Sequence, residues 1–465
     1  MTWPRQKTYW LLVLAFLAVE LLSWLAFQGA PLERFVTGLL IIGALALAWK
    51  RPAWLAAMVV GELVVGSLGH LFFFSIGPVI ISIRMILFGA LLLRAAIDLT
   101  RRVDVHWSGF RPRVLAWLFA WVLVMVGWGL VRGQGISTVY TDANAFLYLL
   151  LIIPWWLYLR SRPQWTGTVL AILLAGATVV ALKSWLMVWL FGQNVSFVGE
   201  LYRWIRQTGV GEITLINANV YRVFFQSQVY TLLVFCLTFS AWVSGQVPRW
   251  WWWPITFSAL GVYISLSKSF WLGLAVGLVV LLAWSVKRFG PRVLSRWLFL
   301  VPLGLIVWLA LNWALYFPGL WPTGVARGNI LLERLNGIGA SQANTARVNE
   351  IKPLLTAISH HPVIGSGFGA TVTYYSTDPR VHGDRTTTAF ELGYLDLWLK
   401  IGLVGLVLYG WWIWQLGRAV ARRPGGMMFI TGLVALLVTN STSPYLNHPL
   451  GLGFLLLMML YADQS

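Results

Sequence analysis

Long apolar runs, separated by short basic or glycine- and proline-rich connections, limit the fold of this chain more than any other feature. Most of these runs extend over roughly 17–25 residues, the length that an α-helix needs to cross about 30 Å of hydrocarbon. We therefore expect an all-α polytopic membrane protein with about fourteen transmembrane helices (12–14). The expected spans are 8–27, 35–49, 53–73, 78–97, 114–131, 143–159, 166–190, 223–243, 250–266, 269–286, 296–316, 390–416, 427–440 and 448–461.

The composition agrees with a membrane protein. Apolar residues make up 59% of the 465 residues and charged residues only 11%, whereas soluble domains are about 45–50% apolar and about 25% charged. The first apolar run lacks a small-residue cleavage site, so we expect a retained helix rather than a signal peptide. Residues 1–465 are expected to form a single integral membrane domain.

The basic residues predict how the chain crosses the membrane. If the N-terminus lies inside, the basic connections all fall on the cytoplasmic side, as the positive-inside rule requires; they are 49–52, 100–113, 159–163, 286–296 and 417–426. We therefore predict a multi-pass protein with both termini inside. These connections hold about half of the basic residues. The net charge of +19 therefore suits anionic membrane lipid and does not call for nucleic acid.

Two of the predicted outer connections are long. Residues 191–222 form the smaller periplasmic loop and residues 317–389 the larger one. Loops of such length in a compact protein are usually functional or disordered. The larger loop is expected to be partly helical, because Val348, Ile351, Leu354, Leu355 and Ile358 recur at helical spacing. Pro353 is expected to start or to kink this helix.

Three basic residues lie within or beside spans, where a charge is costly unless it has a partner or faces a cavity, and a fourth lies in the larger loop. They are Arg84, Arg222, Lys268 and Arg347. One interpretation is that they converge on an anion near the outer leaflet. Since arginine binds phosphate with two parallel hydrogen bonds, a diphosphate would suit such a set. The alternatives are ion pairs with Glu20 or Glu62, extension of the side chain to the interface, and, for Lys268, a place at an interfacial turn.

Short motifs in the second half of the chain occur in a specific order. Arg347 is followed by "HPVIGSGFG" (361–369), by Glu391 to Leu395, and by "GLVGL" (402–406) at the start of a span. "SLSKSFWLGL" (265–274) begins an earlier span. Together these motifs resemble the O-antigen ligase and O-antigen polymerase superfamily, with lysine at 268 where the family usually has arginine. The resemblance covers mainly residues 217–410.

The resemblance implies a metal-independent glycosyltransferase that needs no cofactor. Such an enzyme moves a glycan from undecaprenyl diphosphate to a sugar hydroxyl at the periplasmic face of the bacterial inner membrane. The acceptor would be a glycan or a lipid-A-core-like molecule, so the chain would be an O-antigen or surface polysaccharide polymerase or ligase. Arg84, Arg222, Lys268 and Arg347 would then bind the diphosphate, whose developing negative charge preorganised cations stabilise. The first outer connection, "GAPLERF" (29–35), lacks the acidic pair expected of metal-using lipid-linked transferases.

Transfer to a hydroxyl needs a proton acceptor. The family's histidine is replaced here by Glu391, and a carboxylate can serve as the base in inverting glycosyl transfer. We therefore name Glu391 as the catalytic residue, with a structural glutamate at the helix N-terminus as the alternative. His361 is the second choice for the base. Tyr394 and His382 are assigned to the acceptor side of the loop, and no metal site is predicted because no ligand spacing fits one.

Other functions remain open at this stage. A transporter or flippase of lipid-linked oligosaccharide would also need cations within spans, although it would usually show repeated halves and short loops. A membrane protein that polymerises peptidoglycan and a non-enzymatic scaffold are the remaining alternatives. The sequence leaves the choice between polymerase and ligase undecided.

Overall fold

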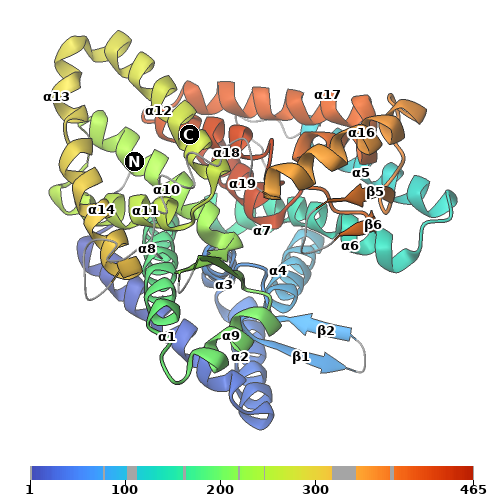
Figure 1. The fold of residues 1–465 in the computed structure, drawn as a ribbon, viewed down its shortest axis with the longest axis horizontal. Coiled ribbons are helices and arrows are strands. Elements are labelled where there is room, and N and C mark those ends of the chain that lie inside the picture. Colours follow the sequence, from blue (N-terminus) through green and yellow to red (C-terminus); the bar gives the residue numbers. More distant parts are fainter. Residues whose placement is uncertain are drawn as a thin grey trace.

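The computed structural model describes residues 3–76, 79–101, 113–160, 164–217, 220–245, 247–316, 342–377 and 382–463 (Figure 1). Within these ranges nine helical segments are long and apolar enough to cross a membrane, and three shorter apolar helices accompany them. A helix occupies each of the predicted spans. The predicted helical polytopic membrane architecture is thereby confirmed, while the exact number of crossings stays a prediction.

The helices of the first half differ widely in length. They are α1 (Gln6–Phe27), α2 (Ala30–Lys50), α3 (Pro52–Val65), α4 (Ile83–Thr100), α5 (Arg113–Val131), α6 (Ile136–Leu147), α7 (Ile152–Trp155), α8 (Gln164–Gln193) and α9 (Val198–Gln207). The second half contains α10 (Val229–Val243), α11 (Trp252–Ile264), α12 (Lys268–Phe289), α13 (Leu294–Trp297), α14 (Leu300–Tyr316), α16 (Gln342–His360), α17 (Gly393–Ala421), α18 (Met427–Thr439) and α19 (Pro449–Asp463).

The fold is not purely helical, because antiparallel hairpins stand at three predicted outer connections. They pair β1 (Phe73–Ile76) with β2 (Val79–Ser82), β3 (Gly211–Asn217) with β4 (Val220–Phe225), and β5 (Val372–Ser376) with β6 (Gly383–Thr387). Three predicted spans are shortened as a result. The span expected over 53–73 is helical only in α3, which ends at Val65. The span expected from residue 78 begins at Ile83, and the span expected from residue 223 becomes helical at Val229 after a short 3-10 turn.

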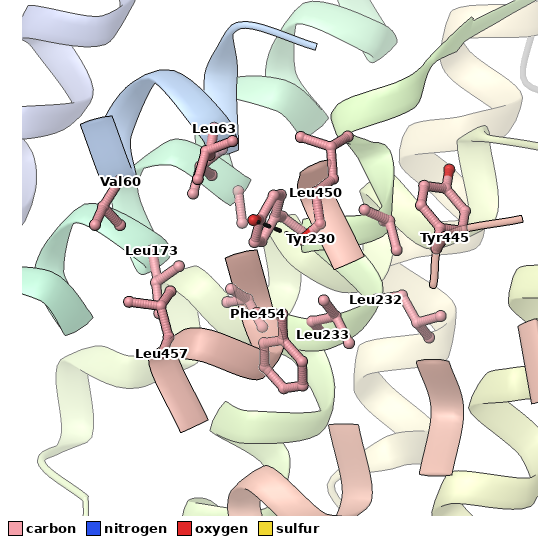
Figure 2. Close-up of a cluster of buried hydrophobic side chains, with 14 of the residues drawn as sticks. Val60, Leu63, Leu173, Tyr230, Leu232, Leu233, Tyr445, Leu450, Phe454 and Leu457 are labelled. Atoms are coloured by element: carbon pink, nitrogen blue, oxygen red, sulfur yellow. Dashed lines mark hydrogen bonds between the residues drawn. The ribbon is translucent and has the colours of Figure 1, made fainter. Parts of the chain in front are cut away.

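The core lies around α10, which packs against α8, α11, α12 and α18. All but one of the α10 side chains are buried, since apolar residues surround the whole helix rather than one face. Figure 2 shows its contact with α19, where the Tyr230 hydroxyl donates to the backbone carbonyl of Leu450 at 2.9 Å. Leu233, Phe454 and Leu457 pack in the same cluster.

The large predicted outer loop is folded where the structure describes it. Residues 342–360 form α16, which contains Pro353, and α16 packs against β5 and α17 (Figure 1). Leu354 and Ile358 face inward with Phe390 and Leu399 and form a small apolar cluster of their own. The predicted helix in this loop is confirmed. Residues 317–341 of the same loop lie outside the described residues, as do 102–112 and 161–163 of the basic connections.

The glycine-rich segment 361–369 fills a break in α17. At Gly402 the backbone leaves the helical region (φ 66°, ψ −176°), so the N–H groups that follow it and the carbonyls that precede it need other partners. The carbonyls of Pro362 and Val363 accept from the N–H groups of Leu403 and Val404 at 3.0 and 3.1 Å. Non-helical backbone at membrane depth is tolerated only where other parts of the protein satisfy its polar groups. Residues 361–369 satisfy the polar groups at this break.

The same segment satisfies the other half of the break. The N–H groups of Ser366 and Gly367 donate to the carbonyls of Leu399 and Lys400 at 2.7 and 3.1 Å. The Gly369 N–H donates to the carboxylate of Asp142 on α6 at 2.8 Å. The glycine segment is therefore a structural part that caps both halves of a broken helix.

A buried charge cluster holds this region together. The Lys400 ammonium on α17 pairs with Asp142 and, at 2.7 Å, with Asp396. Asn447 donates to the same Asp396 carboxylate. The cluster thus joins α6 and α17 to residues 440–448, the segment that connects α18 to α19.

Candidate active site

Residues 440–448 form a polar connection between two apolar helices, and the predicted cations gather around it. The Asn440 side-chain oxygen accepts from the backbone N–H groups of Tyr445 and Leu446, both at 2.9 Å. This fixes the turn of the connection. Its neighbours are α16, the N-terminus of α12 and the end of β4, three elements that lie far apart in the sequence.

Arg347 on α16 contacts this connection directly. Its Nη2 atom donates to the carbonyl of Thr442 at 3.2 Å and lies 2.8 Å from Oε2 of Glu391. The Arg347 side chain is 22% exposed and that of Glu391 is 53% exposed, so the pair lies at a surface that water can reach. Arg347, which is predicted to bind the diphosphate, and Glu391, the predicted base, are therefore neighbours. Glu391 precedes α17 by two residues instead of lying in its first turn.

Lys268 is the first residue of α12 and follows a constrained turn. Leu266 has a positive φ of 48°, a conformation that is uncommon for residues other than glycine. Hydroxyl contacts of 2.9 Å join Ser267 to Ser269, and Ser269 to Ser443 of the connection. A cation at a helix N-terminus is unfavourable, because that end of the helix carries partial positive charge. The helix N-terminus and the lysine would both favour an anion.

Arg222 lies in strand β4, and the hairpin directs it to the same turn. Its Nε atom donates to the carbonyl of Ser265 at 3.0 Å, and its guanidinium lies 4.7 Å from the ring centre of Phe224. The Tyr445 hydroxyl donates to the carbonyl of Gln226 at 3.2 Å. It also interacts electrostatically with the Arg222 guanidinium. Arg222, Lys268 and Arg347 thus all contact, or directly adjoin, the surface built by residues 265–269 and 440–445.

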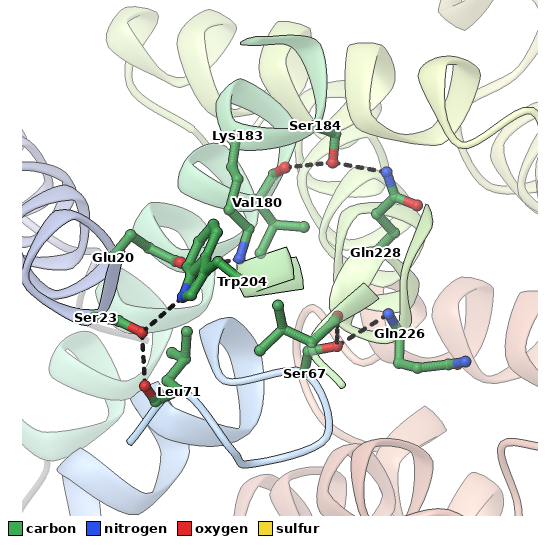
Figure 3. A network of polar contacts seen from close by, with 11 residues as sticks. Glu20, Ser23, Ser67, Leu71, Val180, Lys183, Ser184, Trp204, Gln226 and Gln228 are labelled. Atoms are coloured by element: carbon green, nitrogen blue, oxygen red, sulfur yellow. Dashed lines mark hydrogen bonds and ion pairs between the residues drawn. The ribbon is translucent and has the colours of Figure 1, made fainter. Parts of the chain in front are cut away.

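Arg84 lies behind this surface and has an acidic partner. Its Nε atom is 2.6 Å from Oε2 of Glu62, and Nη2 donates to the carbonyl of Ser67 at 2.7 Å. The Ser67 hydroxyl accepts from the backbone N–H of Gln226 at 3.1 Å (Figure 3). Arg84 is therefore linked to the cation group through Ser67 and Gln226, but Glu62 balances its charge.

A second buried ion pair joins α1 to α8. Lys183 lies 2.5 Å from Glu20 within the polar network of Figure 3. Both acidic residues that the sequence offered as alternative partners are thus used in ion pairs, Glu62 by Arg84 and Glu20 by Lys183. These pairs satisfy the requirement that a charge buried in a membrane protein has a partner.

Glu350 is a site residue that the sequence reasoning did not select. It follows Arg347 by one helical turn and is only 5% exposed. The Tyr374 hydroxyl and the Glu391 backbone N–H lie at its carboxylate, while its Oε2 atom has no hydrogen-bond partner among the described residues. Burial raises the pKa of the Glu350 carboxyl, the Glu391 charge adds to the rise, and the Arg347 charge opposes it.

Glu350→Gln is expected to stabilise the protein at neutral pH. Because the folded-state pKa lies above the ordinary value of 4.5, the folded protein carries an unfavourable charge once the pH exceeds that raised pKa. Wild-type stability then falls as pH rises between the unfolded and folded pKa values. The gain from Glu350→Gln should shrink to nothing as pH falls below the unfolded value. Thermal unfolding of the purified protein over this pH range measures the effect.

Glu350→Asp is the matched control, because it keeps an ionisable group at the position and should keep the pH dependence. A stability difference between Glu350→Gln and wild type that stays constant with pH would contradict the interpretation.

The remaining predicted site residues lie apart from Arg347. Tyr394 donates to the carbonyl of Leu437 at 2.8 Å and so faces α18. His382, beside β6, lies 3.5 Å from the Tyr375 hydroxyl. His361 follows the last residue of α16 and, at 1.5 Å per residue, lies about 20 Å along the helix axis from Arg347. Tyr394 and His382 thus have hydrogen-bond partners other than Arg347 and Glu391, and His361 lies beyond the far end of α16.

The described residues contain no group of three or more His, Cys, Asp or Glu side chains placed to hold a metal ion. The side chains gathered around residues 440–448 support the chemistry of cations and carboxylates. The three basic side chains can bind an anion. The Glu350 and Glu391 carboxylates beside Arg347 can accept a proton.

Comparison with known families places this surface in context. Residues 253–410 match the family model described as O-Antigen ligase. The match includes Lys268, Arg347, Glu350 and Glu391, and it ends before residues 440–448 and begins after Arg222. No curated protein and no solved structure matches the chain.

Proposed function

Because residues 253–410 belong to the O-antigen ligase family, we propose that this chain is a glycosyltransferase of surface polysaccharide synthesis. It takes a glycan from undecaprenyl diphosphate and transfers it to a sugar hydroxyl at the periplasmic face of the inner membrane. Both termini are inside, and α16 with its two hairpin strands lies outside. The acceptor is a glycan or a lipid-A-core-like molecule.

The diphosphate is bound by Arg222, Lys268 and Arg347. These side chains adjoin one surface, and the N-terminus of α12 adds its partial positive charge there. When the glycosidic bond to phosphate breaks, the leaving diphosphate gains negative charge, which preorganised cations stabilise. Arg84 supports this surface through Ser67 and Gln226, and the net charge that it adds is small because Glu62 neutralises it.

Glu391 accepts the proton of the acceptor. The acceptor hydroxyl oxygen forms a bond to the anomeric carbon of the donor sugar, the bond from that carbon to the phosphate oxygen breaks, and the electron pair leaves with the diphosphate. The hydroxyl proton goes to the Glu391 carboxylate. A diphosphate that binds Arg347 competes with Glu391 for the guanidinium. Donor binding would therefore release the Glu391 carboxylate to act as the base.

A single observation carries this proposal. Arg347 contacts both Glu391 and the Thr442 carbonyl, and Ser443 beside Thr442 contacts the Lys268 turn. Arg347 thus contacts the predicted base directly and is linked to the turn that carries Lys268 through Thr442, Ser443 and Ser269. This arrangement would place the base, which takes the proton of the acceptor, beside cations that stabilise the diphosphate leaving the donor.

Deletion of the gene, followed by complementation with Arg222→Ala, tests the proposal in cells. Since each charge-assisted hydrogen bond to phosphate contributes about 1.5–3 kcal/mol, the variant should produce roughly 10- to 100-fold less long-chain product. Electrophoretic ladders of surface polysaccharide measure it. Arg203→Ala is the matched control, because Arg203 is exposed on α9 and is not one of the proposed diphosphate-binding residues.

The deletion strain itself separates the two activities of the family. Loss of long chains with single-unit caps retained indicates a polymerase, whereas accumulation of long lipid-linked polymer indicates a ligase. Lipid-linked single units trapped on the cytoplasmic side would instead indicate a transporter and would overturn the proposal. An unchanged ladder in Arg222→Ala would remove Arg222 from the diphosphate site.

A further inference from the structure

A hollow of about 340 Å³ lies between the C-terminal end of α16 and the connection from α5 to α6. Its lining includes Arg132, Gln134, His360, His361 and Ser366. A second hollow of about 460 Å³ continues along α16, shares His360 and adds Lys352. Both volumes lie in the range of ligand-binding pockets. We call the two together the α5–α16 hollow.

The α5–α16 hollow carries basic side chains without acidic ones. Among the described residues no aspartate or glutamate lines either part. Burial lowers the pKa of the His361 imidazole, and the nearby charges of Arg132 and His360 lower it further. A helix C-terminus favours a nearby cation, and this alone would explain the position of any one of these basic residues. It does not account for a guanidinium, a lysine and two imidazoles that line one cavity, which together offer charge and hydrogen bonds to an anion.

Exposed apolar residues adjoin the hollow. Val131 next to Arg132 is 78% exposed, and Val363 and Ile364 after His361 are 54% and 51% exposed. The hydrogen bonds across the α17 break place the latter two beside Leu403. From there an exposed stripe at helical spacing continues along α17, formed by Leu403, Val407, Trp411 and Trp414. In a membrane protein such a stripe faces acyl chains, so the hollow lies at the end of a lipid-facing surface.

We propose that the α5–α16 hollow binds the phosphate of an anionic lipid headgroup in the predicted outer leaflet. The Arg132 guanidinium and the His360 imidazole contact the phosphate, and the acyl chains follow the apolar stripe of α17. A phosphate ion from solution offers the same charge but would leave the apolar flank unused, so the lipid fits the surface better. The proposal goes beyond the proposed glycosyltransferase and does not depend on it, because the hollow lies at the opposite end of α16 from Arg347.

Native mass spectrometry of the full chain tests the proposal. The delipidated protein in detergent is titrated with phosphatidylglycerol, with phosphatidylcholine, which has a phosphodiester but no net charge, and with inorganic phosphate. We expect wild type to prefer phosphatidylglycerol. Arg132→Gln should weaken that binding about tenfold, and His360→Gln should weaken it less, because a neutral imidazole contributes a hydrogen bond but no full charge.

Arg203→Gln is the matched control, since it removes the same charge from another exposed helix on the predicted outer side. It should leave phosphatidylglycerol binding unchanged. The proposal is overturned if Arg203→Gln weakens binding as much as Arg132→Gln, or if the two lipids bind equally. It is also overturned if inorganic phosphate binds in an Arg132-dependent way while phosphatidylglycerol does not.

Discussion

Arg347→Ala is expected to lower kcat/KM for glycan transfer by roughly 10²–10³, the loss that follows removal of one preorganised group from a transition state. The guanidinium lies 2.8 Å from Glu391 and donates to Thr442 beside the Lys268 turn. Its removal would leave the departing diphosphate one cation short and would also release Glu391 from its orientation. An assay of the purified protein with a lipid-diphosphate donor measures the effect.

Comparison with Glu391→Gln separates the two roles. Loss of the base should lower kcat by about 10²–10⁴ with little change in donor affinity, whereas Arg347→Ala should also raise the KM for the donor. Since the two side chains are in contact, the double variant should be little worse than the more severe single variant. Arg347→Lys keeps the charge but loses the fork that binds phosphate twice, and it should recover activity only in part.

Two outcomes would contradict this assignment. If Glu391→Gln keeps full activity, the carboxylate is not the base, and Glu350 becomes the next residue to test. If Arg347→Ala lowers activity only in proportion to a loss of folded protein, the arginine has a structural role. Thermal unfolding of each variant distinguishes these cases.

Gly402→Ala is expected to prevent accumulation of folded protein. The backbone at Gly402 has φ 66° and ψ −176°, a region that is essentially restricted to glycine. A Cβ at this position would also overlap the carbonyl carbon of Ile364 and the carbonyl oxygen of Val363. Backbone strain of this kind costs about 1–3 kcal/mol, and the loss of the hydrogen bonds that cap the break adds to it. Expression level and thermal unfolding in detergent measure the result.

Gly410→Ala on the same helix is the matched control. No heavy atom lies within 4 Å of the Cβ that it would add, and alanine is a better helix former than glycine by about 1 kcal/mol. This variant should be as stable as wild type or slightly more stable. Equal stability of Gly402→Ala and Gly410→Ala would show that the break in α17 is not required.

The sequence predicted much of the candidate site because its signals are local. Arg222 and Lys268 stood out because each lies at the edge of an apolar run, where a charge is costly, and Arg347 stood out by its place in the order of motifs in the large loop. The spacing of apolar residues in 348–358 predicted the helix that carries Arg347. The structure places these three residues on or directly beside one surface, and it sets Arg84 behind that surface with Glu62 as its partner.

Other parts of the site depend on contacts between distant residues. Thr442 and Tyr445 lie in "NSTSPYLNHP" (440–449), a polar run between apolar ones that marked a connection but not its neighbours. Glu350 has the helical spacing to lie on the Arg347 side of α16, but only the packing against Tyr374 and Glu391 shows that it is buried. No pattern in the sequence predicts that Glu391, forty-four residues after Arg347, is its ion-pair partner.

The glycine-rich "HPVIGSGFG" shows the same division between local and long-range information. Its glycines allow tight backbone turns, because residues without a Cβ adopt conformations that others avoid. Only the tertiary structure decided that these turns cap a broken helix at Gly402. By itself the sequence determined the helical membrane architecture, the helix that carries Arg347 and the basic residues proposed to bind an anion, since hydropathy and helical periodicity are set by neighbours along the chain. The tertiary structure decided which charges neutralise each other and which face the site, because packing between distant segments sets those distances.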